Sequence, residues 1–406
     1  MSPPASGPAH QDRRNAGHSS RPRPRALAVA VPFPVYPPMG GGQVRLYELY
    51  RRLARWHPVE LVCLEPGGHS SRSEVEPHLR QTIIGASPEH RAREAALREE
   101  LGGVPITDVA MPALLHLTPD YARAFRRAAA AADAQIASHP YAAPVMAAHA
   151  PYLPLVYEAH NVEVELKSGT LRSPAALHLV ESVERWCATA ARMVLACSER
   201  DRDRLARRYG LPADRIALVP NGVDDERVPF TSPSSRAHSR ECLFIGSHHP
   251  PNVAAVTRIA ALARAMPGVR FIVAGNVKNG VTTDLPANVS LLGPVTEERK
   301  STLLSTAAVA LNPLDHGSGT SLKVLEYCAA GLPVLSTPQG MRGLDDLAPC
   351  CELAEPDAFE AALAALLARP PAERADVHRA RAVVESRYAW NRIAASARDT
   401  LATLWA

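Results

Sequence analysis

The chain has 406 residues, which is enough for two or three domains of ordinary size. Apolar residues make up 46% and charged residues 21%, values that exclude a mini-protein, a collagen-like repeat and a mostly disordered chain. No apolar run approaches the ~18–20 residues that are needed to span a bilayer. The longest run, 26–35, is broken by Pro32 and Pro34. We therefore expect a buried strand there rather than a signal peptide.

The charge is distributed unevenly along the chain. The net charge of +4 is too small to indicate binding to nucleic acid. Residues 1–57 contain nine arginines against Asp12 and Glu48, a charge of +7, so the rest of the chain carries −3. Residues 1–25 are rich in Pro, Ser, His and Arg without an apolar period, and we expect a disordered basic tail there.

The seven cysteines are scattered, with no CxxC pair and no Cys/His cluster at the spacing of a zinc site. Cys350 and Cys351 are adjacent, which suits neither an ordinary disulfide nor a structural zinc. We expect reduced, buried thiols, as in a cytosolic protein.

Short apolar runs alternate with helical patterns from residue 26 to about residue 220. The predicted strands are 26–31, 59–64, 134–138, 155–158 and 193–196. The predicted helices are 44–56, 88–101, 119–132 and 175–191. Such alternation is typical of βαβ units around a parallel sheet, and it predicts a Rossmann-like domain over 26–220.

A second alternating series follows a Ser-, Pro- and Arg-rich stretch at 221–240, which we interpret as an interdomain linker. Its predicted strands are 242–245, 270–274, 289–292, 309–312, 333–336 and 351–353. Its predicted helices are 252–265, 296–306, 321–330 and 356–368. We expect a second Rossmann-like domain over 241–375 and a C-terminal helix within 376–406 that packs back towards the first domain. The expected fold class is therefore α/β, with two doubly wound domains whose ligands bind between them, outside the carboxyl ends of the strands.

Three consecutive glycines, Gly40, Gly41 and Gly42, follow the first predicted strand and precede the first helix. Glycines let backbone amides approach an anion, and the helix N-terminus adds a partial positive charge. The spacing is neither GxGxxG nor a Walker A loop. The alternative is a flexible turn.

The segment 316–326 is the second candidate loop, because it follows a strand and opens a helix. Gly317 and Gly319 allow close approach of the backbone, and Thr320 or Ser321 can cap the helix. Lys323 falls within the first turn, where it adds a point charge for a phosphate. Glu326 lies three residues later on the same face, where a carboxylate suits two vicinal hydroxyls. The alternative is a capped helix with a surface Lys–Glu pair.

Two histidines follow predicted strands in the first half. His139 comes after 134–138, and His160 comes after 155–158. A loop histidine at a strand end is a candidate acid, base or hydrogen-bond donor. The chain has sixteen histidines, so an ordinary surface or loop role stays open for both.

The second half resembles the donor-binding domain of the retaining, family-4-type glycosyltransferases with the GT-B fold. The segments that carry the resemblance are 244–246 with Pro251 and Asn252, 271–275, 317–326 and 329–334. The segment 219–224 is similar to the hinge signature of that family, and 40–42 with the basic helix after it is similar to its glycine-rich acceptor loop. The resemblance covers about residues 26–400.

The resemblance implies transfer of a sugar from a nucleotide-sugar donor to an acceptor hydroxyl, with retention at the anomeric carbon and without a metal or other cofactor. It implies that Glu326 holds the nucleotide ribose, that Lys323 assists departure of the diphosphate, and that His139 or His160 lies near the anomeric centre. The other donor-binding residues that it implies are Gly41, Gly42, Gly246, Ser247, Gly317, Gly319, Thr320 and Ser321. Arg45 is the residue that we expect to bind the acceptor, which is a sugar, a lipid-linked sugar or another hydroxyl compound.

Two positions depart from the family's pattern. The first glutamate of its E-x7-E signature would fall at Ser318, and the loop after Ile245 has Ser247-His248-His249 where many relatives place an arginine. These departures keep open a non-catalytic relative that binds a nucleotide sugar or a protein partner. A third possibility is another GT-B enzyme, such as an epimerase or a phosphorylase.

The first predicted helix carries Arg45, Arg51, Arg52 and Arg55 among aromatic and aliphatic residues. Basic residues beside aromatic ones suit an anionic bilayer surface, and many relatives glycosylate lipid-linked acceptors in bacterial glycan or glycolipid biosynthesis. We expect a cytoplasmic protein, with peripheral contact at the inner face of the membrane as one possibility. The competing interpretation is that the apolar positions pack on the sheet while the arginines face water.

Overall fold

The computed structural model describes residues 23–317, 319–370 and 376–405. Its first half contains an eight-stranded sheet with the strand order β3-β4-β2-β1-β5-β6-β7-β8. The strands are β1 (Leu27–Val31), β2 (Val59–Glu65), β3 (Ser71–Glu76), β4 (Leu79–Gly85), β5 (Ala134–Ser138), β6 (Leu155–Ala159), β7 (Met193–Ala196) and β8 (Ile216–Leu218). The helices are α1 (Gly41–Leu53), α2 (Pro88–Glu100), α3 (Thr107–Leu114), α4 (Pro119–Ala130), α5 (Ala143–His149), α6 (Glu163–Ser168), α7 (Pro174–Ala190) and α8 (Glu199–Tyr209). All described pairings in this sheet are parallel except that of β3 with β4.

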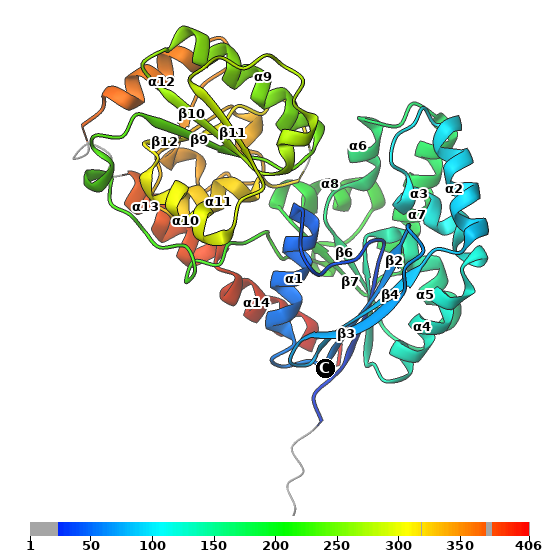
Figure 1. Cartoon of the computed structure of the whole chain (residues 1–406). Coiled ribbons are helices and arrows are strands. Elements are labelled where there is room, and N and C mark those ends of the chain that lie inside the picture. Colours follow the sequence, from blue (N-terminus) through cyan, green and yellow to red (C-terminus); the bar gives the residue numbers. More distant parts are fainter. Residues whose placement is uncertain (1–22, 318, 371–375, 406) are drawn as a thin grey trace, which may run out of the picture.

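The second half contains a six-stranded parallel sheet with the order β11-β10-β9-β12-β13-β14. Its strands are β9 (Glu241–Ile245), β10 (Arg270–Ala274), β11 (Val289–Gly293), β12 (Val309–Asn312), β13 (Val334–Ser336) and β14 (Glu352–Leu353). Its helices are α9 (Pro250–Ala265), α10 (Glu297–Thr306), α11 (Leu322–Ala329) and α12 (Phe359–Ala368). The two α/β domains lie side by side, each with helices around its sheet (Figure 1). The expected fold class is confirmed.

Alternate residues of the central strands enter different cores. In β1, Ala28 and Ala30 belong to the core on one face of the sheet, whereas Leu27, Val29 and Val31 belong to the core on the other face. Both faces are therefore apolar, which is why this strand reads as a continuous apolar run.

The strand prediction missed β3, β4 and β8. The sequence of β3 is Ser-Arg-Ser-Glu-Val-Glu, and its first four residues are exposed at the edge of the sheet. An edge strand without a buried face shows no apolar period. The short helices α3, α5 and α6, together with the strongly charged α8, were also missed.

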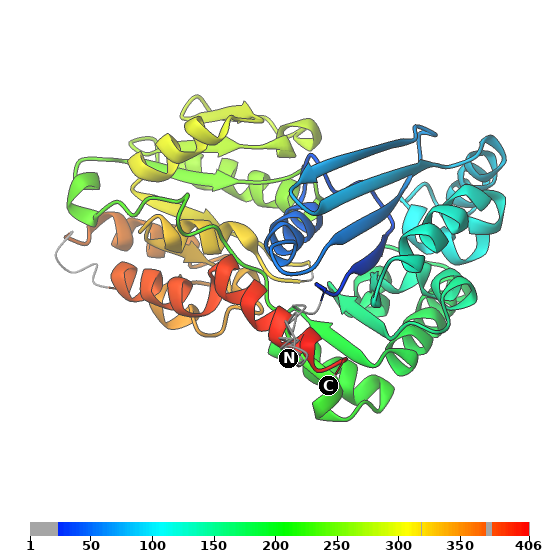
Figure 2. The same ribbon diagram turned by 90° about the horizontal axis from the view of Figure 1, so that it is seen from below.

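The chain crosses between the domains twice. After β8, Val223 donates its N–H to Tyr388 O (2.9 Å) and accepts a hydrogen bond from Trp390 N (3.1 Å) on the returning segment. The helix α13 (Asp376–Val383) and a π-helical turn (Val384–Tyr388) precede this crossing, and α14 (Trp390–Ala402) follows it. Figure 2 shows α14 running back along the first domain, where it packs against α1. The predicted tail, 1–25, lies outside the described residues as far as residue 22, and Arg23 and Arg25 pair with Asp133 at 3.0 and 3.1 Å.

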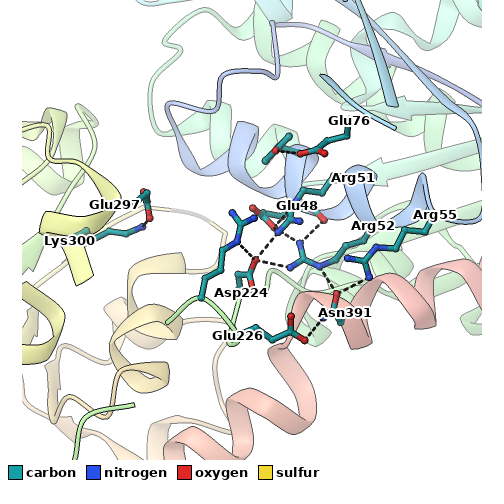
Figure 3. Close-up of polar contacts among 12 residues, drawn as sticks. Glu48, Arg51, Arg52, Arg55, Glu76, Asp224, Glu226, Glu297, Lys300 and Asn391 are labelled. Atoms are coloured by element: carbon teal, nitrogen blue, oxygen red, sulfur yellow. Dashed lines mark hydrogen bonds and ion pairs between the residues drawn. The ribbon is translucent and has the colours of Figure 1, made fainter. Parts of the chain in front are cut away.

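Arg51 and Arg52 of α1, and Arg55 in the turn after it, make contacts within the protein (Figure 3). Arg51 pairs with Asp224 of the interdomain segment at 2.7 Å, and Arg52 pairs with the same carboxylate at 3.0 Å. Arg52 also contacts Glu48 and donates to Asn391 of α14 (2.9 Å). The apolar positions of α1 pack in the core as expected, but the interpretation that its arginines face water is wrong for Arg45 and Arg52, which are 1% and 2% exposed.

In the part of the chain that the structure describes, no helix combines the length and the hydropathy that crossing a bilayer requires. Six of the seven cysteines are buried, Cys351 is half-buried, and all seven are free thiols.

Candidate active site

The strand order reverses at one point in each sheet. In the first sheet β1 lies between β2 and β5, and in the second β9 lies between β10 and β12. Loops at the carboxyl ends of such strands form the usual ligand crevice of α/β sheets. A cavity of about 400 Å³ opens there between the domains, and we call it the histidine cavity. Its lining includes Gly40, Gly41, Gly42, Arg45, His139, His160, Asn161, Gly319, Thr320 and Leu322.

The two predicted histidines lie together in this cavity. The ring centroids of His139 and His160 are 4.3 Å apart, and the ring of Phe33 meets His139 edge-on at 5.6 Å. His139 adopts a φ of +67°, a backbone conformation that is uncommon for a residue with a side chain. Its Nδ1 lies 3.0 Å from Glu163 Oε1, and its Nε2 is buried without a hydrogen-bond partner among the described residues. An unpartnered buried ring nitrogen at a cavity indicates a ligand that would complete its hydrogen bonding.

His160 differs from His139 in its hydrogen bonding. Its Nε2 lies 3.1 Å from Ser138 Oγ and 3.5 Å from Glu158 Oε1. Burial and the neighbouring His139 lower the pKa of His160 to about 4, so the ring is neutral at pH 7. A Cβ on Gly42 would lie 3.8 Å from Nδ1 of His160, so the first turn of α1, which begins at Gly41, lies next to this ring.

Arg45 lines the same cavity as the two histidines, and its guanidinium donates hydrogen bonds to groups within the protein. Its Nε donates to Glu158 Oε1 (3.1 Å), and its other nitrogens donate to Val219 O (2.9 Å) and to Pro220 O and Asn221 Oδ1 (both 3.1 Å). Burial alone would raise the pKa of Glu158, but contacts with His160 and Arg45 lower it to about 2. Arg45 is 1% exposed. The structure therefore gives it a role in tying α1 to the interdomain segment, and the expected contact with an acceptor stays a prediction.

The glycine-rich segment of the second domain faces the histidines across the cavity. Gly317 and Gly319 have φ angles of +122° and +65°, which explains the glycines in this loop. Ser321 is the N-cap residue of α11, but its hydroxyl makes no capping hydrogen bond. Within the described residues, the hydroxyls of Thr320 and Ser321 are buried without partners. Unpaired hydroxyls and the free amides of a helix N-terminus together suit an anion. Ser318 lies outside the described residues.

The side chain of Lys323 bonds to the start of α9 rather than to Glu326. Its Nζ donates to Asn252 Oδ1 (2.6 Å) and lies 4.1 Å from the centroid of the Phe244 ring. Burial and the nearby Arg342 lower the pKa of Lys323 to about 7. A lysine that is this easily deprotonated needs an anion to hold its charge. The alternative of a surface Lys–Glu pair is therefore wrong.

Arg342 is a site residue that the sequence analysis missed. It follows β13 and lines a pocket of about 130 Å³ together with Gly317, Gly319 and Gln339. A Cβ on Gly317 would lie 3.0 Å from Nη2 of Arg342. Burial and Arg200 lower the pKa of Arg342 to about 10. An arginine is thus present in the segment after β13, whereas the loop after Ile245 has none, and a position in a segment that follows a strand is the signal that could have found it.

Comparisons with known proteins place both halves of the chain in one class of enzyme. Residues 39–227 match the family model "Glycosyltransferase Family 4", and residues 239–369 match "Glycosyl transferases group 1". The chain belongs to the glycosyltransferases. The glycogen synthase of Mycobacterium tuberculosis is 24% identical over 255 residues, which are 60% of this chain and 61% of that protein. The match thus spans less than two thirds of that curated relative's length.

Solved structures share the GT-B fold of this glycosyltransferase. Sucrose-phosphate synthase from Thermosynechococcus elongatus superposes with a TM-score of 0.74 at 17% identity, covering 94% of this chain and 99% of that one. HepE from Anabaena, solved in complex with UDP and glucose, superposes with a TM-score of 0.64 at 16% identity, covering 93% of this chain and 100% of that one.

Glu326 of the glycosyltransferase lines a different cavity, also of about 400 Å³, which we call the hinge cavity. Tyr47 and Glu48 of α1, Asp224 and Arg227 of the interdomain segment, and Lys300 of α10 also line it. Lys300 Nζ donates to Glu326 Oε1 (2.9 Å), a partner that the sequence analysis did not identify. Leu322 lines both cavities, so they adjoin at the start of α11.

The remaining predicted donor residues lie in the loop after β9. A Cβ on Gly246 would come within 2.9 Å of the Phe244 ring and 3.2 Å of Asn252 Cβ, so a larger residue would disturb that loop. Ser247 accepts two hydrogen bonds from Asn252, through its carbonyl oxygen (3.0 Å) and its hydroxyl (3.2 Å). The structure thus brings the two loops at the switch point of the second sheet into contact through Asn252 and Lys323.

Proposed function

We propose that this glycosyltransferase binds a nucleotide sugar and transfers the sugar to an acceptor hydroxyl with retention of the anomeric configuration, without a metal ion. The observation that carries the proposal is the arrangement across the histidine cavity. Within the described part of the chain, Thr320, whose hydroxyl is unpaired, and Leu322 at the start of α11 line this cavity together with His139, whose Nε2 is unpaired. Lys323 lies in the same turn of α11 outside the cavity lining, and Arg342 lines a second pocket that shares Asn161 and Gly319 with the cavity. The hydroxyl, the helix amides and the two cations suit a diphosphate, and His139 Nε2 suits a sugar hydroxyl.

The main chemical task in such a reaction is to stabilise the negative charge that develops on the departing nucleoside diphosphate. Lys323, Arg342 and the amides at the start of α11 are oriented before substrate arrives, so they need little reorganisation at the moment of reaction. The carboxylate of Glu163 accepts a hydrogen bond from His139 Nδ1, and Nε2 on the other side of the ring is left to hydrogen-bond with a hydroxyl of the sugar. Support for a uridine nucleotide and glucose comes from HepE, which was solved with UDP and glucose.

The proposal is tested by incubating the purified protein with a panel of nucleotide sugars and measuring release of nucleoside diphosphate. Release with one donor that accelerates with a hydroxyl acceptor is expected, and NMR of the product gives the anomeric configuration. Binding of a nucleotide sugar without release, whatever the acceptor, would instead favour the non-catalytic relative. Ser318 and the missing arginine after Ile245 motivate that alternative, and Arg342 weakens it.

Replacing Glu326 by alanine should weaken donor binding while the fold survives. Each charge-assisted hydrogen bond to a ribose hydroxyl contributes about 1.5–3 kcal/mol, so the dissociation constant should rise at least tenfold. Calorimetry with the donor, or with its nucleoside diphosphate, measures this rise.

Glu297→Gln is the matched control for Glu326, because Glu297 is the other partner of Lys300 (2.9 Å) and its side chain is 87% exposed. This variant should bind the donor as the wild type does. An unchanged dissociation constant in Glu326→Ala would remove Glu326 from the donor site.

The acceptor and the location in the cell are further parts of the proposal. We propose a cytoplasmic enzyme that acts on a sugar, a lipid-linked sugar or another hydroxyl compound. Peripheral contact with an anionic membrane rests on the basic composition of residues 1–22 and on Arg55, which is exposed although it donates to Asn391 Oδ1 (3.4 Å). Arg45, Arg51 and Arg52 are engaged within the protein, and Arg23 and Arg25 pair with Asp133.

Liposome co-sedimentation tests this contact. We expect binding only to anionic vesicles, and we expect it to fall at high salt, where surface charges are screened. Equal and negligible binding in all conditions would contradict membrane contact and favour a soluble or carrier-delivered acceptor.

A further inference from the structure

Asn252 is a buried amide that connects two loops of the proposed donor site. It lies in the first turn of α9 and is 8% exposed. Its Oδ1 accepts from Lys323 Nζ (2.6 Å), and its Nδ2 donates to the carbonyl and hydroxyl oxygens of Ser247 (3.0 and 3.2 Å). The loop after β9 and the first turn of α11 are thus held together by one side chain.

Lys323 depends on Asn252 for its position. A lysine side chain is flexible, and an aromatic face such as that of Phe244 attracts the ammonium group without fixing its direction. The hydrogen bond to Asn252 supplies the direction.

Among the described residues, Arg342 and His249 are the groups that interact electrostatically with Lys323, and Glu326 and Tyr327 lie farther along the same helix, where they bond to Lys300 and Ile245. Arg342, from the segment after β13, lowers the pKa of Lys323, and Lys323 in turn helps to lower the pKa of His249, after burial and the effects of His316 and Arg342. A neutral amide orients the ammonium group and leaves its charge available to a diphosphate. An aspartate at position 252 would neutralise that charge before the substrate arrives.

We infer that Asn252 is a positioning residue in the binding of the diphosphate, which is the leaving group. It orients Lys323 and holds the Ser247–His249 loop in place beside it. The inference rests on the proposed function, because it assigns a task to Asn252 within the same donor site. It explains the amide at this position through its hydrogen bonds rather than through the packing of α9.

The test is a double-mutant cycle with Asn252→Ala, Lys323→Met and the combined variant. Calorimetry with UDP, ADP and GDP gives the dissociation constants, and turnover is measured with the donor that the wild type uses. Asn252→Ala should raise the dissociation constant and lower kcat about tenfold in the wild-type background. It should have almost no further effect in the Lys323→Met background, because residues that act as a unit are not additive. Equal losses in both backgrounds would overturn the inference, since they indicate a structural role.

Asn252→Asp is the second variant, and it keeps the shape and the hydrogen-bond acceptor. It should weaken diphosphate binding and move the alkaline limb of the pH–rate profile to higher pH, because the carboxylate holds the proton on Lys323. An unchanged pH profile would contradict the inference. Ser247→Ala, which keeps the carbonyl bond to Asn252, should retain most of the coupling between Asn252 and Lys323.

The failure of the inference differs from the failure of the proposed function. If the wild type binds none of the three nucleoside diphosphates, the proposed function fails. If the wild type binds one of them and Asn252→Ala binds it equally well, only the inference fails. Circular dichroism of each variant shows whether the fold is kept, and Asn252→Asp decides the question if Asn252→Ala does not fold.

Discussion

Replacing Lys323 by methionine should lower turnover by at least tenfold and weaken nucleoside diphosphate binding. Methionine keeps most of the apolar stem against Phe244 but removes the ammonium charge. That charge matters most when the diphosphate departs. The factor by which kcat falls should therefore exceed the factor by which affinity for the sugar part of the donor falls. A fall of less than tenfold, which corresponds to 1.4 kcal/mol, would mean that another group neutralises the phosphate.

The pH dependence gives a second signature of Lys323. Its pKa of about 7 in the free protein means that binding of an anion at higher pH must first restore the proton. Affinity for a nucleoside diphosphate should therefore be full below pH 7 and should fall by up to tenfold per pH unit above it. This slope should be absent from Lys323→Met and present in Lys278→Met, which removes an exposed lysine of the same domain.

The same lowered pKa links Lys323 to folding. Between pH 7 and the ordinary lysine pKa of 10.5, the unfolded chain binds more protons than the folded one. The free energy of unfolding should thus rise with pH across this window in the wild type and lose that contribution in Lys323→Met. If Lys323 has the role proposed for it, it favours function at some cost in stability, as active-site residues often do.

Most of the fold could be predicted because its central strands are buried on both faces and its helices carry regular apolar stripes. The exceptions have physical reasons. β3 is a polar edge strand that pairs with β4, and β8 has only three residues. An apolar period is visible in the sequence only where a strand or helix buries several residues along one face.

The candidate site could be predicted as a set of loops but not as a set of contacts. Glycines, a helix start and histidines after strands indicate candidate ligand loops, because the position of a loop between a strand and a helix is encoded locally. The partners of the charged residues are not. Lys323 meets Asn252 across 71 positions of sequence, and Lys300 meets Glu326 across 26. Lys323 and Glu326 lie three residues apart on α11, as predicted. Their side chains nevertheless bond to different residues, Asn252 and Lys300.

The distant partners of the buried Arg45 could not be predicted from the sequence either. Among the substitutions that we propose, Arg45→Met should lower the free energy of unfolding most. Arg45→Met breaks an ion pair with Glu158 that is almost completely buried, and it also leaves three oxygens of the interdomain segment without their donor. Loss of one partner of a buried pair costs about 3–5 kcal/mol, because the remaining charge stays in a poorly solvated place. Arg55→Met, at an exposed position in the turn that follows the same helix, should change stability by no more than about 0.5 kcal/mol.

The pH dependence of stability and a second substitution distinguish a structural role of Arg45 from direct binding of the acceptor. In the wild type, Glu158 stabilises the fold above its ordinary pKa of 4.5, and this contribution is lost as the pH falls towards its folded pKa of about 2. Without Arg45 the pKa of Glu158 rises, so the destabilisation measured by urea unfolding should be greatest at neutral pH and should shrink as the pH approaches 4. Arg45→Met with Glu158→Gln should recover part of the loss, since no buried carboxylate is left unpaired. Wild-type stability in Arg45→Met, together with a raised KM for the acceptor, would instead make Arg45 an acceptor ligand.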